Sequence, residues 1–276
     1  MKQAMIFAAG LGTRLKPLTD TMPKALVRVG GEPLLWHVVQ RLKAAGYAHI
    51  VVNVHHFAQQ IVDYLREQNN FGIDIRISDE SERLLETGGG IKKAIPLFDD
   101  DEEPVLIHNV DILDNVDYDW FHRQHRSDED AVLLVSRRKT RRYLLFDSAM
   151  RLMGWTNIET GEVKSPYPWL RDAAVTIDDS FSAHVVEQRP SFSTSSVGRE
   201  REGALYAFAF SGIHSFSPRL FPLMGRFPDR FPIMDFYLSV CHRARVVGLV
   251  KPDLKMLDVG KLDSLEEAER FLACTI

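Results

Sequence analysis

Two hydrophobic periodicities alternate along the first half of the chain. Apolar residues recur at helical spacing over residues 33–46 and 57–65. Short apolar or alternating runs, the pattern of strands, cover residues 5–7, 50–54, 73–77, 104–109 and 131–136. Strands that alternate with helices are typical of an α/β protein with a mostly parallel sheet and helices on both faces. Residues 73–77 are expected near an edge of that sheet, because only every second residue there is apolar.

The second half of the chain has a different pattern. Two apolar runs at residues 143–146 and 151–155 flank Asp147 and Ser148, which predicts a hairpin. Residues 171–202 are rich in Ser, Thr, Asp and Arg and have no clear apolar period. A long stretch of this kind is expected to be a structureless lid, mobile loop or disordered segment. Regular patterns return in a strand at 205–216, a helix at 232–241, a strand at 246–250 and a helix from 263.

The candidate chemistry begins in the loop after the first strand. Gly10 and Gly12 permit backbone angles that direct several N–H groups into one concavity, which suits an anion. Thr13 adds a hydroxyl, and Arg14 and Lys24 add cations at the two ends of the loop. Small residues for close approach, donors for oxygens and cations for charge together predict a triphosphate site.

Three other classes of glycine-rich segment do not fit this loop. A dinucleotide-binding fingerprint requires Gly or Ala at the position occupied by Leu15. No segment matches the P-loop pattern of phosphate-binding NTPases. The apolar stretch is too short for a signal peptide, and Arg14 and Lys16 follow it at once.

The opening stretch resembles the signature of the sugar-1-phosphate nucleotidylyltransferases. The matching positions are AAGLGTRL at residues 8–15 followed by Pro23 and Lys24. The resemblance implies a Rossmann-like nucleotidyltransferase fold with a small sugar-binding β subregion. It implies one domain over residues 1–276, with a nucleotide-binding part at about 1–136 and a sugar-binding part at about 137–260. The polar insert at 171–202 belongs to the latter.

Residues 85–91, LETGGGI, form a second informative stretch. Three glycines before a helix would let the main chain approach a flat or charged group. The family commonly has L-G-T-A-G here, where backbone groups contact the nucleobase, and Glu86 replaces the first glycine. The form E-T-x-G-G-I is more similar to the N-acetylmuramate-1-phosphate uridylyltransferase branch and to related mannose- or heptose-phosphate enzymes.

Two aspartates are the expected metal ligands. Asp111 lies just past the predicted strand at 104–109, where it would face the same crevice as the opening loop. Asp258 lies in L-D-V-G, which is similar to the D-V-G-T-P motif of the family. The resemblance implies that Asp111 and Asp258 hold Mg²⁺.

The resemblance also assigns the remaining site residues. Arg14 and Lys24 would be catalytic, and Gly154, Lys164 and Gly212 would face the sugar. Arg189 competes with Lys164 for the place of the family's sugar-phosphate lysine. The residues implied to bind nucleotide are Ala8, Ala9, Gly10, Gly12, Thr13, Thr87, Gly88 and Asn109.

The implied reaction joins a nucleoside triphosphate and a sugar 1-phosphate into a nucleoside-diphosphate sugar, with release of pyrophosphate, as in cell-wall or polysaccharide precursor synthesis. A mannose- or heptose-1-phosphate guanylyltransferase is the alternative to an N-acetylmuramate-1-phosphate uridylyltransferase, and a non-catalytic nucleotide-sugar binding protein is an alternative of another class. The net charge of −4 gives no reason to expect nucleic-acid or membrane binding. Two distant cysteines, without metal-ligand spacing, suggest free thiols in the cytoplasm. We expect a monomer or a small homo-oligomer.

Overall fold

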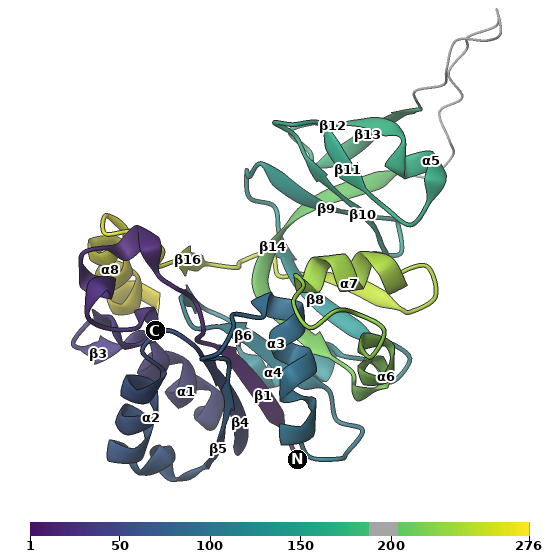
Figure 1. Ribbon diagram of the computed structural model, residues 1–276. Helices are drawn as coiled ribbons and strands as arrows, with labels where there is room; N and C mark the ends of the chain where they lie inside the picture. Colours follow the sequence, from purple (N-terminus) through teal and green to yellow (C-terminus); the bar gives the residue numbers. More distant parts are fainter. Residues whose placement is uncertain (188–203, 276) are drawn as a thin grey trace, which may run out of the picture. The chain divides into compact units, whose positions relative to one another are not determined.

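A computed structural model describes residues 1–187 and 204–275 (Figure 1). Its contacts divide the chain into two compact units. The first unit contains Met1–Arg126, Gly212–Ile233 and Asp253–Ile276, and the second contains Ser127–Ser211 and Met234–Pro252. Strand β14 (Leu205–Phe216) begins in the second unit and ends in the first.

A mostly parallel sheet forms the centre of the first unit. Its strand order is β14-β6-β1-β4-β5, in which β6, β1, β4 and β5 run parallel and β14 is antiparallel to β6. The parallel strands are β1 (Gln3–Phe7), β4 (His49–Val54), β5 (Asp74–Asp79) and β6 (Val105–Asn109). Residues of β1 and β4 are almost entirely buried, as expected of strands covered on both faces. The parallel sheet and the edge position of β5 confirm the expectation from the sequence.

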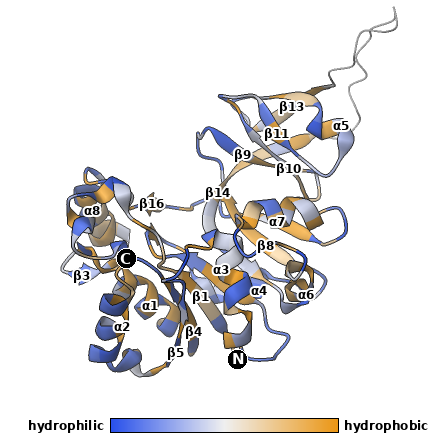
Figure 2. Cartoon of the chain, in the orientation of Figure 1, coloured by the Kyte–Doolittle hydropathy of each residue, from blue (hydrophilic) through white to orange (hydrophobic). Residues whose placement is uncertain are grey.

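Helices cover both faces of this sheet. Figure 1 shows α1 and α2 on one face and α3 on the other, which is the arrangement that right-handed crossovers require for this strand order. Leu34, Val38 and Leu42 lie on the buried face of α1 at helical spacing. In Figure 2 the central strands are mostly orange, whereas α1 and α2 carry both colours. The helices of this unit are α1 (Leu34–Ala44), α2 (Ala58–Glu67), α3 (Glu86–Ala94), α4 (Tyr118–Gln124), α6 (Phe221–Met224) and α8 (Ser264–Thr275).

Two small sheets complete the first unit. Strand β16 (Met256–Asp258) pairs antiparallel with β7 (Ile112–Asp114), and β2 (Arg28–Val29) pairs with β3 (Glu32–Pro33). Glu32 and Pro33 therefore precede α1 rather than opening it. No helix among the described residues is long and apolar enough to cross a bilayer.

The second unit is built mainly from β-strands. Strands β9, β10 and β11 form an antiparallel meander, which confirms the predicted hairpin, and β8 pairs in parallel with β15. The start of β14 pairs with β9 and β13. The elements are β8 (Ala131–Ser136), β9 (Arg142–Phe146), β10 (Leu152–Asn157), β11 (Glu162–Lys164), α5 (Pro168–Arg171), β12 (Ala173–Ile177), β13 (Ser182–Glu187), α7 (Ile233–Val240) and β15 (Val246–Val250).

The expectation that residues 171–202 lack regular structure is wrong for their first half. Strands β12 and β13 form an antiparallel hairpin in which Val175 pairs with Val185. Val175, Ile177 and Val185 pack against a buried cluster around Tyr143 and Leu145. Widely spaced apolar residues were enough to build strands because this cluster covers one face of them, which a search for long apolar runs misses. Residues 188–203 lie outside the described part of the chain.

Candidate active site

The parallel strands bring one row of residues to the same edge of the first unit. Phe7 at the end of β1 is in register with Asn53 on β4 and with Asn109 on β6. Beyond this row lies a cavity of about 410 Å³. It is lined by Phe7, Ala8, Ala9, Gly10, Lys24, Asn53, Glu80, Leu84, Glu86, Thr87, Asn109, Val110, Asp111 and Pro232. Ligands of open α/β sheets bind at this carboxyl edge of the strands.

The glycine-rich loop keeps its backbone open toward an anion. A side chain at Gly10 would meet nothing within 4 Å. Gly12 has a φ of 63°, and a methyl group there would lie 2.8 Å from the Thr19 side chain, so both its conformation and its surroundings require glycine. Among the described residues, no protein acceptor takes a backbone N–H of residues 10–13. These N–H groups are therefore not committed to protein acceptors, and both the anion-binding concavity and nucleotide binding by the loop stay predictions.

Three charged side chains from distant segments converge beside this loop. The Lys24 ammonium pairs with Asp111 Oδ2 and lies 3.9 Å from Asp258 Oδ1. The Lys24 side chain is only 9% exposed, because a 3₁₀ turn at Lys24–Leu26 directs it inward. The ammonium group of Lys24 thus lies between two carboxylates, those of Asp111 and Asp258.

Local pairing explains how Asp258 reaches Asp111. Asp258 is opposite Ile112 in the β16–β7 pair, and the N–H of Val259 donates to the carbonyl of Asp111 at 2.8 Å. A methyl group on Gly260 would lie 2.7 Å from Asp258 Oδ1 and 3.0 Å from Arg14 Nη2. Glycine at 260 therefore leaves room for both the Asp258 carboxylate and the Arg14 guanidinium beside it.

The carboxylate pair fits a magnesium ion. Mg²⁺ is usually held by one or two carboxylates together with substrate phosphates and water, rather than by a complete protein cage. Asp111 and Asp258 supply two hard oxygen donors that already lie around one cation. No group of three or more His, Cys, Asp or Glu within residues 1–187 and 204–275 is arranged to hold a metal alone. Phosphate oxygens would therefore have to complete the coordination.

Asn53 and Glu80 form a buried hydrogen-bonded pair that lines the cavity. Asn53 Oδ1 accepts the N–H of Ala8 at 2.7 Å, and its Nδ2 donates to Glu80 Oε1 at 2.8 Å. Glu80 Oε2 accepts the N–H of Leu85 at 3.0 Å. Burial raises the pKa of Glu80, against the opposing effect of its hydrogen bonds. The pair ties the glycine-rich loop to the start of α3.

A second buried network lies next to Asp111 in sequence. Asp114 is fully buried and accepts hydrogen bonds from Arg41 at 3.0 Å and from the Tyr118 hydroxyl at 2.9 Å, and it contacts His108 at 3.1 Å. Burial opposes ionisation of Asp114, but the hydrogen bond and charge of His108, together with Arg41, outweigh it and lower its pKa to about 2. This network anchors the segment that carries Asp111.

The three glycines at 88–90 lie inside α3, not before it as expected. The N–H groups of Gly88 and Gly89 donate to the carbonyl of Phe231 at 2.9 and 3.1 Å. A methyl group on Gly88 would lie 2.3 Å from the Phe231 ring, and one on Gly89 would lie 2.0 Å from the carbonyl of Asp229. The glycines therefore serve close packing of the segment around Phe231, and the contact of Gly88 with a nucleotide stays a prediction. Thr87 lines the cavity, although its hydroxyl already accepts the N–H of Ile233.

The residues expected to bind sugar are divided between the two units. A methyl group on Gly212, whose φ is 83°, would lie 2.7 Å from Asn109 Nδ2, so glycine there makes room for Asn109. In the second unit, Gly154 is crowded by Leu170. Lys164 pairs with Asp235 at 3.5 Å and lies over the Trp155 ring. Their sugar contacts stay predictions, and Arg189 lies outside the described residues.

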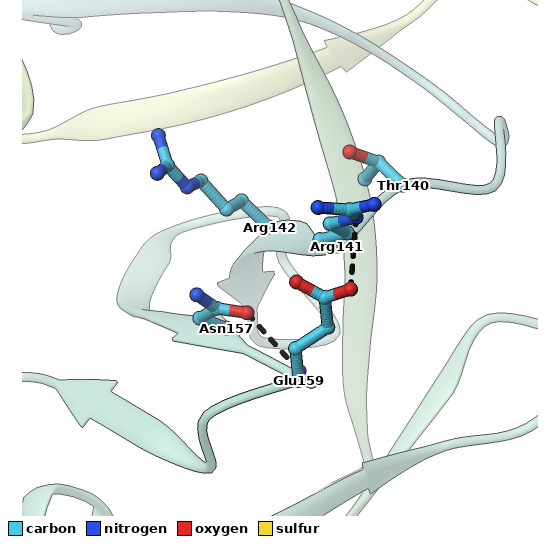
Figure 3. A pocket seen from close by; sticks show the side chains of 5 residues that line it. All are labelled: Thr140, Arg141, Arg142, Asn157 and Glu159. Carbon is cyan, nitrogen blue, oxygen red and sulfur yellow. Dashed lines mark hydrogen bonds and ion pairs between the residues drawn. The ribbon is translucent and has the colours of Figure 1, made fainter.

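The second unit also has a polar surface hollow (Figure 3). It measures about 470 Å³ and is lined by Thr140, Arg141, Arg142, Asn157 and Glu159. Arg141 points toward Glu159 and pairs with it at 2.9 Å. Of the described residues, neither Gly154, Lys164 nor Gly212 lines this hollow.

Sequence reasoning missed Asn53, Glu80 and the spatial role of Gly260. Asn53 lies near the end of the predicted strand at 50–54, and Glu80 follows the one at 73–77. A search for polar residues at every predicted strand end could have found them. The approach of Arg14 to Gly260 had no local signal, because these residues lie at opposite ends of the chain.

Residues 3–143 match the family described as Nucleotidyl transferase. The chain belongs to this family. Within it, the chain is 50% identical to an N-acetylmuramate alpha-1-phosphate uridylyltransferase of Caulobacter vibrioides over 114 residues, 41% of this chain and 46% of that protein. It is 36% identical to a mannose-1-phosphate guanyltransferase of Neurospora crassa over 145 residues, 51% of this chain and 39% of that protein. The alignments thus span less than half of either relative.

Solved structures share the fold over nearly the whole chain. HddC from Yersinia pseudotuberculosis, complexed with GMP-PN, matches with a TM-score of 0.62 and 22% identity, covering 99% of this chain and 100% of that one. A putative glucose-1-phosphate thymidylyltransferase from Bacillus anthracis matches with a TM-score of 0.66 and 18% identity, covering 100% and 96%. At these identities the likeness concerns the mixed α/β fold alone.

Proposed function

We propose that this nucleotidyl transferase family member is a sugar-1-phosphate nucleotidylyltransferase, which forms a nucleoside-diphosphate sugar and pyrophosphate. The observation that carries the proposal is the convergence of Lys24, Asp111 and Asp258 beside an open glycine-rich loop. A cation, two acids and unpaired amides at one sheet edge suit a polyphosphate. A dehydrogenase or a covalent hydrolase would not need this combination.

The proposed step is a direct displacement at the α-phosphorus of the nucleoside triphosphate. An oxygen of the sugar 1-phosphate attacks, the bond to the bridging oxygen breaks, and pyrophosphate leaves with its electron pair. The attacking phosphate is already anionic, so the step needs no strong general base. Its main difficulty is to hold two polyanions in line and to spread the developing charge.

The chain's own residues meet that difficulty by positioning and charge. Arg14 and the amides of residues 10–13 would bind the leaving pyrophosphate. Lys24 would neutralise charge near the α-phosphate. Positioning of this kind can supply roughly 7–11 kcal/mol of the barrier reduction.

Asp111 and Asp258 would hold Mg²⁺. When bound, the ion supplies charge neutralisation to the phosphate oxygens. The position of both acids around Lys24 supports this assignment. The cytoplasmic location suggested by the two free cysteines stays a prediction.

For the substrates, we propose a uridylyltransferase that acts on N-acetylmuramate 1-phosphate. The 50% identity to the Caulobacter vibrioides enzyme supports this choice. A mannose- or heptose-1-phosphate guanylyltransferase is the second candidate, supported by the match to the Neurospora crassa guanyltransferase. Both candidates use the same site chemistry and differ in the base and the sugar.

The test is a matrix of the four nucleoside triphosphates against several sugar 1-phosphates, scored by released pyrophosphate in the presence of Mg²⁺. We expect rapid release with one combination and loss of at least about 100-fold in Arg14→Ala and Asp111→Asn. Nucleotide-sugar binding without pyrophosphate release would instead support a non-catalytic binding protein. Near-normal release from either variant would contradict the roles assigned to Arg14 and Asp111.

A further inference from the structure

Glu86 has a backbone conformation that its residue type disfavours. Its φ is 63°, in the left-handed region that glycine adopts most easily. Of the described non-glycine residues with positive φ, only Glu86 lines the cavity of the first unit. Strained residues of this kind persist where the surrounding structure fixes them, and they cluster at functional sites.

The segment at 229–233 fixes Glu86 in this conformation. The N–H of Phe231 donates to the carbonyl of Leu85 at 3.2 Å, and the carbonyl of Phe231 accepts the N–H groups of Gly88 and Gly89. These bonds bracket Glu86 on both sides. They require the glycines, because side chains at 88 and 89 would collide with this segment.

The same segment places Arg230 against the Glu86 carboxylate. Arg230 Nε and Nη2 both contact Oε1 of Glu86, at 3.0 and 2.9 Å. Oε2 of Glu86 has no partner among the described residues. The Glu86 side chain is 33% exposed and lines the cavity. The guanidinium therefore orients the carboxylate and leaves one strong acceptor unoccupied.

The cavity around Glu86 suits a nucleobase. Lys24 and the open loop amides attract phosphates, whereas Leu84 and Pro232 add apolar surface that suits the face of a flat ring. The neighbouring Thr87 hydroxyl is already engaged by the N–H of Ile233. Among the described residues, Glu86 Oε2 is thus a charged acceptor without a protein partner in this part of the cavity.

We propose that Glu86, oriented by Arg230, accepts a hydrogen bond from a ring N–H of the nucleobase and so determines which bases the enzyme uses. Uracil and thymine present N3–H, and guanine presents N1–H. Cytosine and adenine present a ring-nitrogen lone pair at these positions, which a carboxylate repels. The inference rests on the proposed function and adds a base-selecting residue to it.

The test compares selectivity in Glu86 variants. We measure kcat/KM for UTP, GTP, CTP and ATP with a fixed sugar 1-phosphate in wild type, Glu86→Gln and Glu86→Gly. The preference of the best oxo-base nucleotide over CTP and ATP should fall by about 10- to 100-fold in both variants. Glu86→Gly should fold normally with an equal or higher Tm, because glycine suits a φ of 63°.

Arg230 acts through Glu86, so it is a positioning residue, and its replacement should change the kinetic constants in a different way from replacement of Glu86. Arg230→Gln should raise KM for the preferred nucleotide and reduce base selectivity, with kcat nearly unchanged. Arg226→Gln is the matched control, because Arg226 is an exposed arginine in the same part of the chain and no contact joins it to Glu86. That control should leave KM and selectivity at wild-type values.

Direct calorimetric binding of UTP, GTP, CTP and ATP to the same proteins separates this inference from the proposed function. A protein that binds UTP or GTP in preference to CTP and ATP, and loses that preference in Glu86→Gln, supports the inference even if it releases no pyrophosphate. An unchanged preference in Glu86→Gln and Glu86→Gly overturns it, even in an active enzyme. A wild-type protein with no preference for oxo-bases overturns it as well.

Discussion

Replacement of Asn53 should destabilise the first unit through two specific hydrogen bonds. In Asn53→Ala the buried N–H of Ala8 loses its acceptor, which costs about 1–3 kcal/mol. Glu80 also loses one of the two donors that contact its carboxylate, a bond of about 1.5–3 kcal/mol. Water can enter the adjacent cavity and replace part of both, so we expect a net loss of about 2–4 kcal/mol.

The control is a double variant, Asn53→Asp with Glu80→Gln, in which the amide and the acid exchange places. Asn53→Asp alone keeps the acceptor for Ala8 but places a second acid against Glu80, so it should be at least as destabilising as Asn53→Ala. Adding Glu80→Gln supplies a new amide donor toward the aspartate and keeps an oxygen for the N–H of Leu85. The double variant should therefore recover most of the lost stability.

Urea denaturation measures these effects, followed by tryptophan fluorescence. The first unit contains Trp36 and Trp120, which report its transition. A loss of about 2–4 kcal/mol corresponds to a fall in Tm of about 3–7 °C for a chain of this size, at roughly 2.1 cal/mol/K of unfolding entropy per residue. Two results would refute the reasoning: a loss below about 0.5 kcal/mol in Asn53→Ala, or a double variant whose loss equals the sum of the single losses.

Three further predictions follow from the site. Asp111→Asn should reduce pyrophosphate release at least about 100-fold and change Tm by less than about 2 °C, and a large fall in Tm would show that its role is structural. Burial raises the pKa of Glu80 in the folded state above its value in the unfolded state. The contribution of Glu80 to the free energy of unfolding should therefore decline as the pH rises from the unfolded-state pKa through the folded-state pKa. Glu80→Gln should remove this slope in denaturation midpoints measured between pH 4 and 8. Gly89→Ala should lower the free energy of unfolding by about 2 kcal/mol despite the better helix propensity of alanine, because the methyl group would lie 2.0 Å from the carbonyl of Asp229. Gly10→Ala is the control: it has open space around it and should shift the denaturation midpoint little. Equal shifts in the two variants would contradict the packing role of Gly89.

Much of the fold followed from local patterns. The alternation of apolar runs with helical periods correctly predicted the parallel strands and the helices between them, because burial on both faces leaves a strong signal in each segment. The hairpin at Asp147 and the long strand β14 were also visible locally. Strands β12 and β13 were not, because their apolar residues are sparse and gain their order from the cluster around Leu145.

The sequence by itself determined the chemical character of the site. The spacing of Gly10, Gly12, Arg14 and Lys24 predicted a phosphate-binding loop, and Asp111 stood at the end of a predicted strand. These signals are local, because a loop conformation and a strand end depend mostly on neighbouring residues. Side-chain type and short spacing were therefore sufficient.

Tertiary structure alone decided which distant groups meet. Only the β7–β16 pairing brings Asp258 to Lys24 and Asp111. Only the packing of the 229–233 segment on α3 shows that the glycines there make room for Phe231 and aim Arg230 at Glu86. The physical reason is that these contacts join residues more than 100 positions apart, so their geometry depends on the whole first unit rather than on any local pattern.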